Sequence, residues 1–128
     1  MDYQETSLAS ALKGENNDCS VKALAIASGK HYDVVHAILK AEGRKDRKGA
    51  YMPQIMAAAN KLGLKCYNIT RQRKQWGTVR GIVSKLRGNR TYLVHTSRHI
   101  LPVVNGKVED WTDGRLNRVV TVWQIDKA

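Results

Sequence analysis

The sequence predicts an α+β domain in which N-terminal helices pack on a C-terminal antiparallel β-sheet. Apolar residues recur at helical spacing through the first two thirds of the chain. Residues 91–96 and 99–104, in the last third, are rich in residues that favour strands. Because the helices come first and the strands follow, the order favours α+β over a repeating βαβ unit.

Each predicted helix of the first half begins at a residue that favours a helix start and ends at a glycine. Asn17 or Asp18 can cap the first helix, Asp33 can cap the second, and Pro53 suits the first turn of the third. The terminating glycines are, in the same order, Gly29, Gly43 and Gly63. Residues 1–15 show little periodicity and predict an irregular arm or a short helix.

The second half predicts one strand, one helix and an antiparallel meander. Residues 64–70 predict the strand, and Thr78 can cap a helix that ends at Gly88. Asn105-Gly106 is a strong signal for a two-residue hairpin turn. The predicted strands of the meander are 91–96, 99–104, 107–111 and 119–125.

Composition indicates one domain over residues 1–128 with a strong attraction for polyanions. The net charge is +11, which favours nucleic acid or an acidic protein surface as a partner. Trp76 could stack on a base or serve as a packing residue, and the basic loops could equally be solvated surface. The candidate polyanion-binding residues are Arg44, Lys45, Arg47, Lys48, Arg71, Arg73 and Lys74.

The cysteines and the absence of a targeting segment indicate a cytoplasmic protein. Cys19 and Cys66 are too few for a disulfide framework, and no CxxC pair suggests zinc. We therefore expect free thiols and no metal or cofactor, although a disulfide between the two would disable Cys19. The sequence shows no secretory signal and no membrane span.

Cys19 is the candidate nucleophile because it lies at the start of a predicted helix. Unpaired backbone N–H groups and the positive end of the helix dipole favour thiolate over thiol there. Cys66 lies in the middle of a predicted strand and is interpreted as packing. A base and an orienting carboxylate would complete the machinery for attack on a carbonyl carbon.

Among the four histidines, His99 is the candidate base. His31 and His36 belong to the second helix region and are expected at the surface. His95 and His99 could both meet the thiolate. His99 is favoured because it opens a strand whose hairpin partner carries Asp110.

Asp110 is the candidate orienting acid. The predicted hairpin register pairs it with Leu101, one diagonal step from His99. Glu109 should point to the opposite face, and Asp113 is the fallback. The alternative interpretation of this segment is a polar turn beside a half-buried tryptophan.

The oxyanion of an acyl-transfer reaction also needs hydrogen-bond donors. The backbone N–H of Cys19 is one, and the side-chain amide of Asn17 or Asn16 could be the second. An asparagine at this position can equally be a helix cap.

Several of these segments together resemble papain-like cysteine peptidases, and more narrowly the small single-domain papain-fold proteins of bacteriophages and bacteria, which are distantly similar to bacteriocin-processing peptidases. The segments are Asn17-Asp18-Cys19-Ser20-Val21-Lys22-Ala23-Leu24-Ala25, Gly29, Tyr32-Asp33, Val35-His36, Gly43-Arg44, His99, Asn105-Gly106 and Asp110-Trp111. The resemblance implies a papain-like fold with Cys19 as nucleophile, His99 as general base and Asp110 as orienting acid.

Two departures from the family pattern concern the oxyanion site and its surroundings. Lys13 stands where such enzymes place a glutamine, and Ser20 where glycine often follows the cysteine. The resemblance implies a phage-encoded cysteine peptidase that acts on a protein or peptide in the host cytoplasm. Alternatives are a deamidase or transglutaminase with the same triad, and a basic binding module on a peptidase-like scaffold.

Overall fold

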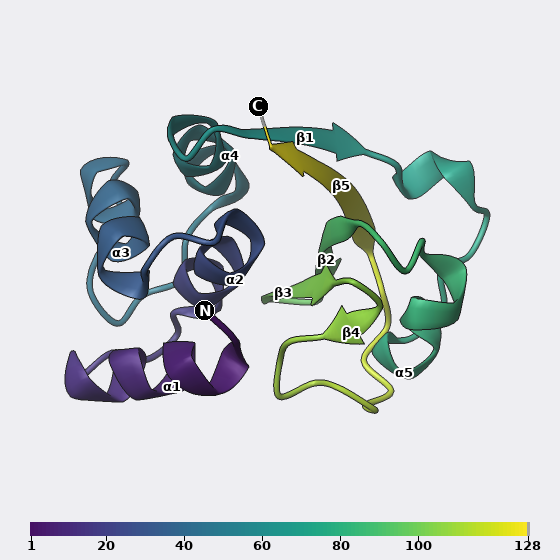
Figure 1. Ribbon diagram of the computed structural model, residues 1–128, viewed down its shortest axis with the longest axis horizontal. Helices are drawn as coiled ribbons and strands as arrows, with labels where there is room; N and C mark the ends of the chain where they lie inside the picture. Colours follow the sequence, from purple (N-terminus) through teal and green to yellow (C-terminus); the bar gives the residue numbers. More distant parts are fainter. Residues whose placement is uncertain (128) are drawn as a thin grey trace.

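The computed structural model describes residues 1–127, and Ala128 lies outside the described residues. The fold is α+β, with helices packed on a five-stranded antiparallel sheet (Figure 1). The helices are α1 (Tyr3–Leu12), α2 (Cys19–Ser28), α3 (Tyr32–Ala41), α4 (Met52–Lys61) and α5 (Val79–Ile82), with 3₁₀ turns η1 (Thr70–Gln72) and η2 (Val83–Lys85). The strands are β1 (Leu64–Asn68), β2 (Thr91–Thr96), β3 (His99–Val104), β4 (Lys107–Val108) and β5 (Thr121–Lys127). Within residues 1–127 no helix has the length and apolar character needed to cross a bilayer.

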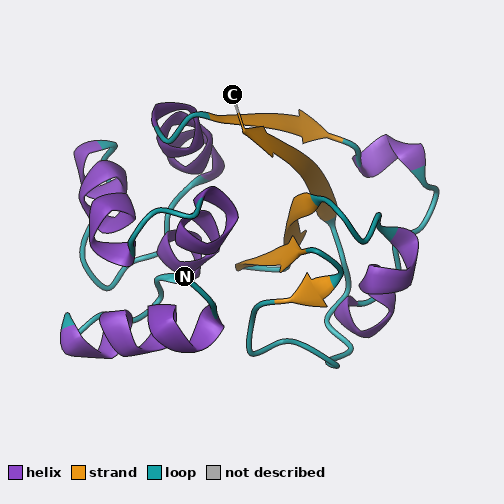
Figure 2. Cartoon of the chain, in the orientation of Figure 1, coloured by secondary structure: helices purple, strands orange, loops and turns teal. Residues whose placement is uncertain are grey.

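The sheet separates two apolar clusters. Its strand order is β1-β5-β2-β3-β4, and α1 to α4 lie to one side of it with α5 on the other (Figure 2). One cluster joins α2, α3 and α4 to the sheet, and its buried strand members are Leu64, Leu93, Ile100 and Ile125. The other cluster contains Val79 and Ile82 of α5 with the remaining buried strand residues. This layering buries apolar surface on both faces of the sheet.

Helix α2 is the central helix, and its N-terminal end lies against β3. It ends at Gly29, whose φ of 73° is the left-handed conformation that closes a helix. Most of its length is buried, because it is enclosed by α1, α3, α4 and the sheet. The packing of α2 on β3 brings the first residue of the helix close to the strand that opens with His99.

The helix starts differ in detail from those predicted. Residues 3–12 form a regular helix that begins with a reciprocal capping box between Asp2 and Glu5. Helix α3 begins one residue before Asp33, and the His31 ring accepts the Asp33 N–H, so the prediction of Asp33 as cap is wrong. Asp18 occupies the cap position of α2, but its carboxylate accepts a hydrogen bond of 2.5 Å from the Tyr32 hydroxyl instead.

The second half confirms the meander and shortens some elements. Asn105 (φ 50°) and Gly106 (φ 77°) form the predicted turn, and the Val103–Val108 and Val104–Lys107 pairs have the predicted register. Strand β4 stops at Val108, although the Glu109 N–H still donates to the Pro102 carbonyl at 3.1 Å. The helix after Thr78 is a single α-helical turn followed by η2, shorter than expected, with Gly81 inside it.

Candidate active site

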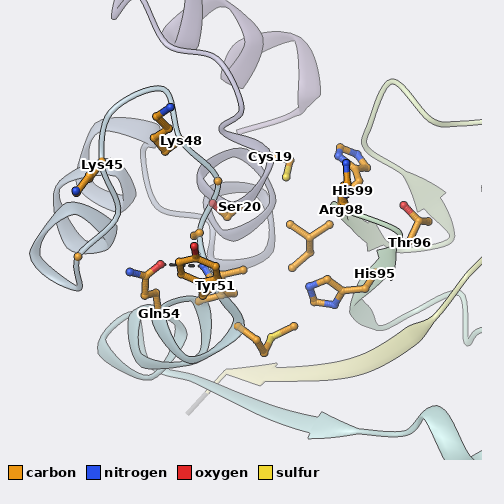
Figure 3. A pocket seen from close by; sticks show the side chains of 16 residues that line it. Cys19, Ser20, Lys45, Lys48, Tyr51, Gln54, His95, Thr96, Arg98 and His99 are labelled. Carbon is orange, nitrogen blue, oxygen red and sulfur yellow. Dashed lines mark hydrogen bonds between the residues drawn. The ribbon is translucent and has the colours of Figure 1, made fainter.

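Cys19 lines a cavity of about 740 Å³ between the helical part and the sheet (Figure 3). His99 of β3 lies on the side opposite the loop that joins α3 to α4, and Ile100 also lines the cavity. The thiol is partly exposed rather than buried. The structure therefore brings the sulfur of the first half and the imidazole of the second half to one cavity, as the sequence predicted.

His99 and Asp110 are directly hydrogen-bonded. The His99 Nε2 atom lies 2.7 Å from Asp110 Oδ2. The same carboxylate oxygen accepts a bond from the backbone N–H of Thr112 at 3.1 Å and one from its hydroxyl at 2.5 Å. Asp110 is buried, so its carboxylate is fixed in place beside the ring. The indole of Trp111 packs on His99 with ring centroids 5.3 Å apart.

Cys19 and His99 shift the pKa of one another. Burial acts to raise the pKa of the Cys19 thiol, but its hydrogen bonds with the His99 side chain and the Ile100 backbone outweigh this, and its pKa is lowered. Burial acts to lower the pKa of His99, but the hydrogen bonds to Asp110 and Cys19 raise it to about 9. Both shifts favour a thiolate–imidazolium pair. Because Asp110 holds Nε2, Nδ1 is the ring nitrogen left for the sulfur.

His95 also lines the cavity, but its pKa is shifted in the direction opposite to that of His99. Burial and the neighbouring charge of His99 lower its pKa to about 4, so it is neutral at pH 7. Its Nδ1 atom is buried and has no hydrogen-bond partner among residues 1–127. No carboxylate holds this ring in the described part of the chain, which supports His99 rather than His95 as the base.

The predicted alternatives to Asp110 have other positions. Glu109 accepts the Tyr3 backbone N–H at 3.0 Å and pairs with Lys107 at 3.3 Å. Asp113 is exposed, and its backbone N–H donates to the Asp110 carbonyl at 3.2 Å. Neither carboxylate is bonded to His99 in the described structure.

The predicted oxyanion donors differ in whether they are free to face the cavity. The Cys19 N–H precedes the first intrahelical hydrogen bond of α2, which runs from the Lys22 N–H to the Asp18 carbonyl, and is free to donate. Asn16 and Asn17 do not line the cavity, because Asn17 donates its amide to the Arg47 carbonyl at 3.3 Å and to the Asn16 side chain at 3.2 Å. The arrangement does not support either as the second donor.

Ser20 supplies another hydroxyl beside the nucleophile. It lines the same cavity, is buried, and its Oγ atom lacks a hydrogen-bond partner in the described residues. Lys13, at the position of the family's glutamine, instead forms an ion pair with Asp33 at 3.4 Å. A donor from the position six residues before the cysteine is therefore not available in this arrangement.

The basic residues of the stretch 44–48 differ in exposure: one is buried in an ion pair, and the others are exposed. Arg44 is 3% exposed and both of its terminal nitrogens donate to Glu15 at 3.1 Å, so its prediction as a polyanion-binding residue is wrong. Lys45 and Lys48 are exposed and line the cavity, whereas Arg47 is exposed and uses its backbone N–H to bind Glu15 at 2.9 Å.

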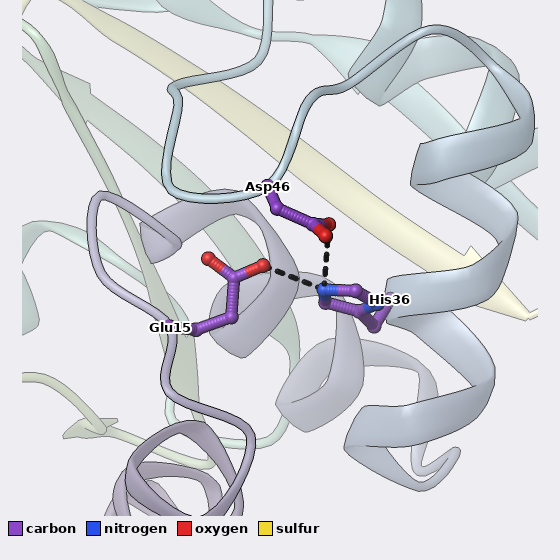
Figure 4. A group of neighbouring side chains, drawn as sticks. All are labelled: Glu15, His36 and Asp46. Atoms are coloured by element: carbon purple, nitrogen blue, oxygen red, sulfur yellow. Dashed lines mark hydrogen bonds and ion pairs between the residues drawn. The ribbon is translucent and has the colours of Figure 1, made fainter.

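Glu15 is the centre of a buried polar cluster (Figure 4). His36 Nε2 lies 2.6 Å from Glu15 and 3.6 Å from Asp46. Burial acts to raise the pKa of Glu15, but hydrogen bonds from Arg44, His36 and the Arg47 backbone lower it to about 2. His36 is 8% exposed, so its predicted surface position is wrong, while His31 is exposed as expected.

The Glu15, His36 and Asp46 ligand atoms lie within 4.8 Å of one another, a spacing that can hold a metal ion. The Arg44 guanidinium, however, occupies both Glu15 oxygens and places a positive charge at the same point. These contacts fit a structural ion-pair network better than a cation site.

The second basic stretch lies away from the cavity. Arg71, Arg73 and Lys74 are exposed near the end of η1. Trp76 is 6% exposed and its indole N–H donates to the Thr70 carbonyl at 2.8 Å, so it is a packing residue and not a base-stacking one. A cavity of about 580 Å³ beside it is lined by Arg73, Lys85, Arg87 and Arg90.

Both cysteines are free, as expected. Cys66 packs against the cluster around α2, and burial raises the pKa of its thiol. Its environment thus differs from that of Cys19, whose pKa is lowered by a base.

Sequence reasoning missed two residues of this site. Thr112, two positions after Asp110, fixes the acid, and the Asp-x-Thr spacing of a local side-chain turn is a signal that could have indicated it. Arg98 also lines the cavity, but only the fold reveals this. Comparison of the chain with models of known families, with curated proteins and with solved structures finds no match in any of the three.

Proposed function

We propose that this protein is a cysteine peptidase, or a closely related thiol-dependent acyl-transfer hydrolase, with Cys19, His99 and Asp110 as its triad. The single observation that carries the proposal is the hydrogen bond between His99 and Asp110 at the edge of an open cavity that Cys19 and His99 both line, where His99 lowers the pKa of the Cys19 thiol. A lowered thiol pKa and a raised imidazole pKa are the electrostatic conditions that such a nucleophile needs.

The reaction begins when the Cys19 thiolate attacks the carbonyl carbon of an amide. The backbone N–H of Cys19 donates to the oxyanion, and the C–N bond then breaks as the His99 imidazolium gives its proton to the leaving amine. This leaves a thioester on Cys19. Water attacks the thioester while His99 takes one of its protons, and the release of the carboxylic acid regenerates the thiolate–imidazolium pair.

A peptide mixture tests the proposal. The protein is incubated with synthetic peptides of varied sequence, and the products are identified by mass spectrometry. We expect fragment pairs that together equal the parent peptide plus one water, lost in Cys19→Ser and His99→Ala and retained in the matched variant Cys66→Ser. Conversion of glutamine side chains without backbone cleavage would indicate a deamidase instead. Absence of any product or thioester adduct would contradict the proposal.

A second candidate function is polyanion binding by the basic surface beyond α5. The observation that favours it is the cavity lined by Arg73, Lys85, Arg87 and Arg90, close to the exposed Arg71 and Lys74. We expect a labelled oligonucleotide to bind with an affinity that falls steeply with salt and is unchanged in Cys19→Ala. Binding that is undetectable at low salt would dismiss this function.

A further inference from the structure

We infer that the cavity beside Cys19 takes polypeptide segments that carry carboxylates, an inference that rests on the peptidase function proposed above. The charged side chains that line the cavity, apart from the histidines, are Lys45, Lys48 and Arg98. Figure 3 shows the two lysines on one wall and Arg98 on the wall of His99, with Cys19 between them. A substrate that reaches the sulfur therefore passes between cations.

The wall of lysines is held in place by the residues next to them. Arg44 donates twice to Glu15, and the Arg47 backbone N–H binds the same carboxylate. Asp46 lies 3.6 Å from His36 (Figure 4). These contacts attach Arg44, Asp46 and Arg47 to the helical part of the fold. Lys45 and Lys48 are the members of the segment that line the cavity.

Arg98 forms the opposite wall in a backbone conformation that favours glycine. Its φ is 60°, in the turn between Thr96 and His99. An L-residue with a long side chain adopts this conformation only at an energetic cost, and such cost is concentrated at functional sites. The arginine side chain at this position lines the cavity immediately before the general base.

No acidic side chain among the described residues balances these charges. The cavity lining contains no aspartate or glutamate, and Lys45, Lys48 and Arg98 take part in no ion pair within residues 1–127. The His99 imidazolium adds a further positive charge beside the sulfur. Met52, Ile55 and Ile100 supply apolar surface in the same cavity. The lining thus fits an apolar side chain flanked by carboxylates.

Alkylation of Cys19 by two reagents of different charge tests the inference. Iodoacetate and iodoacetamide both form an S–C bond with the thiolate and release iodide, but only iodoacetate carries a carboxylate. The measurement is the ratio of their rate constants at Cys19, followed by mass spectrometry. Because the His99 charge alone favours iodoacetate, the comparison is between variants that all retain His99.

The cavity variant is Lys45→Gln/Lys48→Gln/Arg98→Gln, and the matched control is Lys30→Gln/Lys65→Gln/Arg80→Gln. The control removes the same net charge from exposed residues that lie outside the cavity lining. We expect the iodoacetate preference to fall about fivefold in the cavity variant and to change little in the control. Equal ratios in the cavity variant and the control would overturn the inference.

The same data separate this inference from the proposed function. Fast alkylation of Cys19 with no dependence on the cavity charges overturns the inference alone. Alkylation of Cys19 by both reagents as slow as that of Cys66 overturns the proposed function and the inference together.

Protection of Cys19 from iodoacetamide identifies the source of the carboxylate. A glutamate-rich peptide with an amidated C-terminus tests side-chain carboxylates, and a glutamine-rich peptide with a free C-terminus tests the terminal one. If either of these peptides protects Cys19 more than a lysine-rich peptide does, the result supports the inference and identifies the source of the carboxylate. Equal protection by the lysine-rich peptide, protection only by an oligonucleotide, or no protection overturns it.

Discussion

Asp110 is the residue on which the geometry of the site depends. Its Oδ2 atom accepts from the Thr112 hydroxyl and N–H and faces the Nε2 atom of His99. The ring is thereby fixed on one side, while Trp111 packs against it. This fixed orientation leaves the other ring nitrogen for the sulfur, and the buried negative charge stabilises the imidazolium.

Replacement of this acid tests its role at the residue scale. Asp110→Asn keeps the shape of the side chain but removes the charge that helps to raise the pKa of His99. We expect alkylation of Cys19 by iodoacetamide at pH 7 to slow by about tenfold, the effect of one unit in the pKa that controls the thiolate. The matched control is Asp113→Asn, a change at an exposed carboxylate of the same turn. Equal slowing in both variants would contradict an orienting role for Asp110.

At the scale of elements, the segment between α3 and α4 is stabilised by Glu15. The Glu15 side chain is 2% exposed and that of Arg44 is 1% exposed, so the pair is removed from water. A buried carboxylate without its partner is costly, because the charge has lost its hydration. The loop between α3 and α4, which forms one wall of the cavity, is therefore attached to Glu15 in the segment that precedes α2.

Loss of this pair should destabilise the whole fold. Arg44→Ala leaves Glu15 with His36 and the backbone N–H groups of Asn16 and Arg47 but without its buried countercharge, and we expect the free energy of unfolding to fall by about 3 kcal/mol. Arg47→Ala, which removes an exposed side chain but retains the backbone bond, is the control, with an expected change of about 0.5 kcal/mol or less. Urea denaturation measures both values. Equal loss in the two variants would rule out a special contribution of the buried pair.

The sequence predicted those features that depend on local patterns. The Asn105-Gly106 turn sets the register of its hairpin, and this register alone predicts that Asp110 lies near His99. The extent of α2 followed from the cap candidates Asn17 and Asp18, from the apolar spacing and from Gly29 at its end. These signals act over a few residues and so can be recognised in a single sequence.

Features that depend on partners far along the chain could not be predicted. Arg44 resembles a solvated loop residue until Glu15, which precedes it by 29 positions, is seen to bind it. The burial of His36 has the same cause. Trp76 offered two interpretations, and only the bond from its indole to the Thr70 carbonyl shows that it packs inward.

At the scale of the whole molecule, the site exists because two differently built halves meet. Helix α2 supplies Cys19, the proposed nucleophile, whereas β3 and the turn after β4 supply His99 and Asp110, the proposed base and acid. The packing of α2 on β3 joins the halves, with Leu24 and Ile100 in their shared apolar cluster. The mutual pKa shifts of Cys19 and His99 are the electrostatic consequence of this contact.

The pH dependence of Cys19 alkylation by iodoacetamide tests this contact most directly. The wild-type protein should react rapidly at pH values well below the ordinary thiol pKa of about 8.5, with a change in rate near pH 9 as His99 loses its proton. In His99→Ala the rate should rise only as an ordinary thiol ionises, and Cys66 serves as an internal reference because burial raises its pKa. Identical profiles for wild type and His99→Ala would contradict a thiolate–imidazolium pair between the two halves.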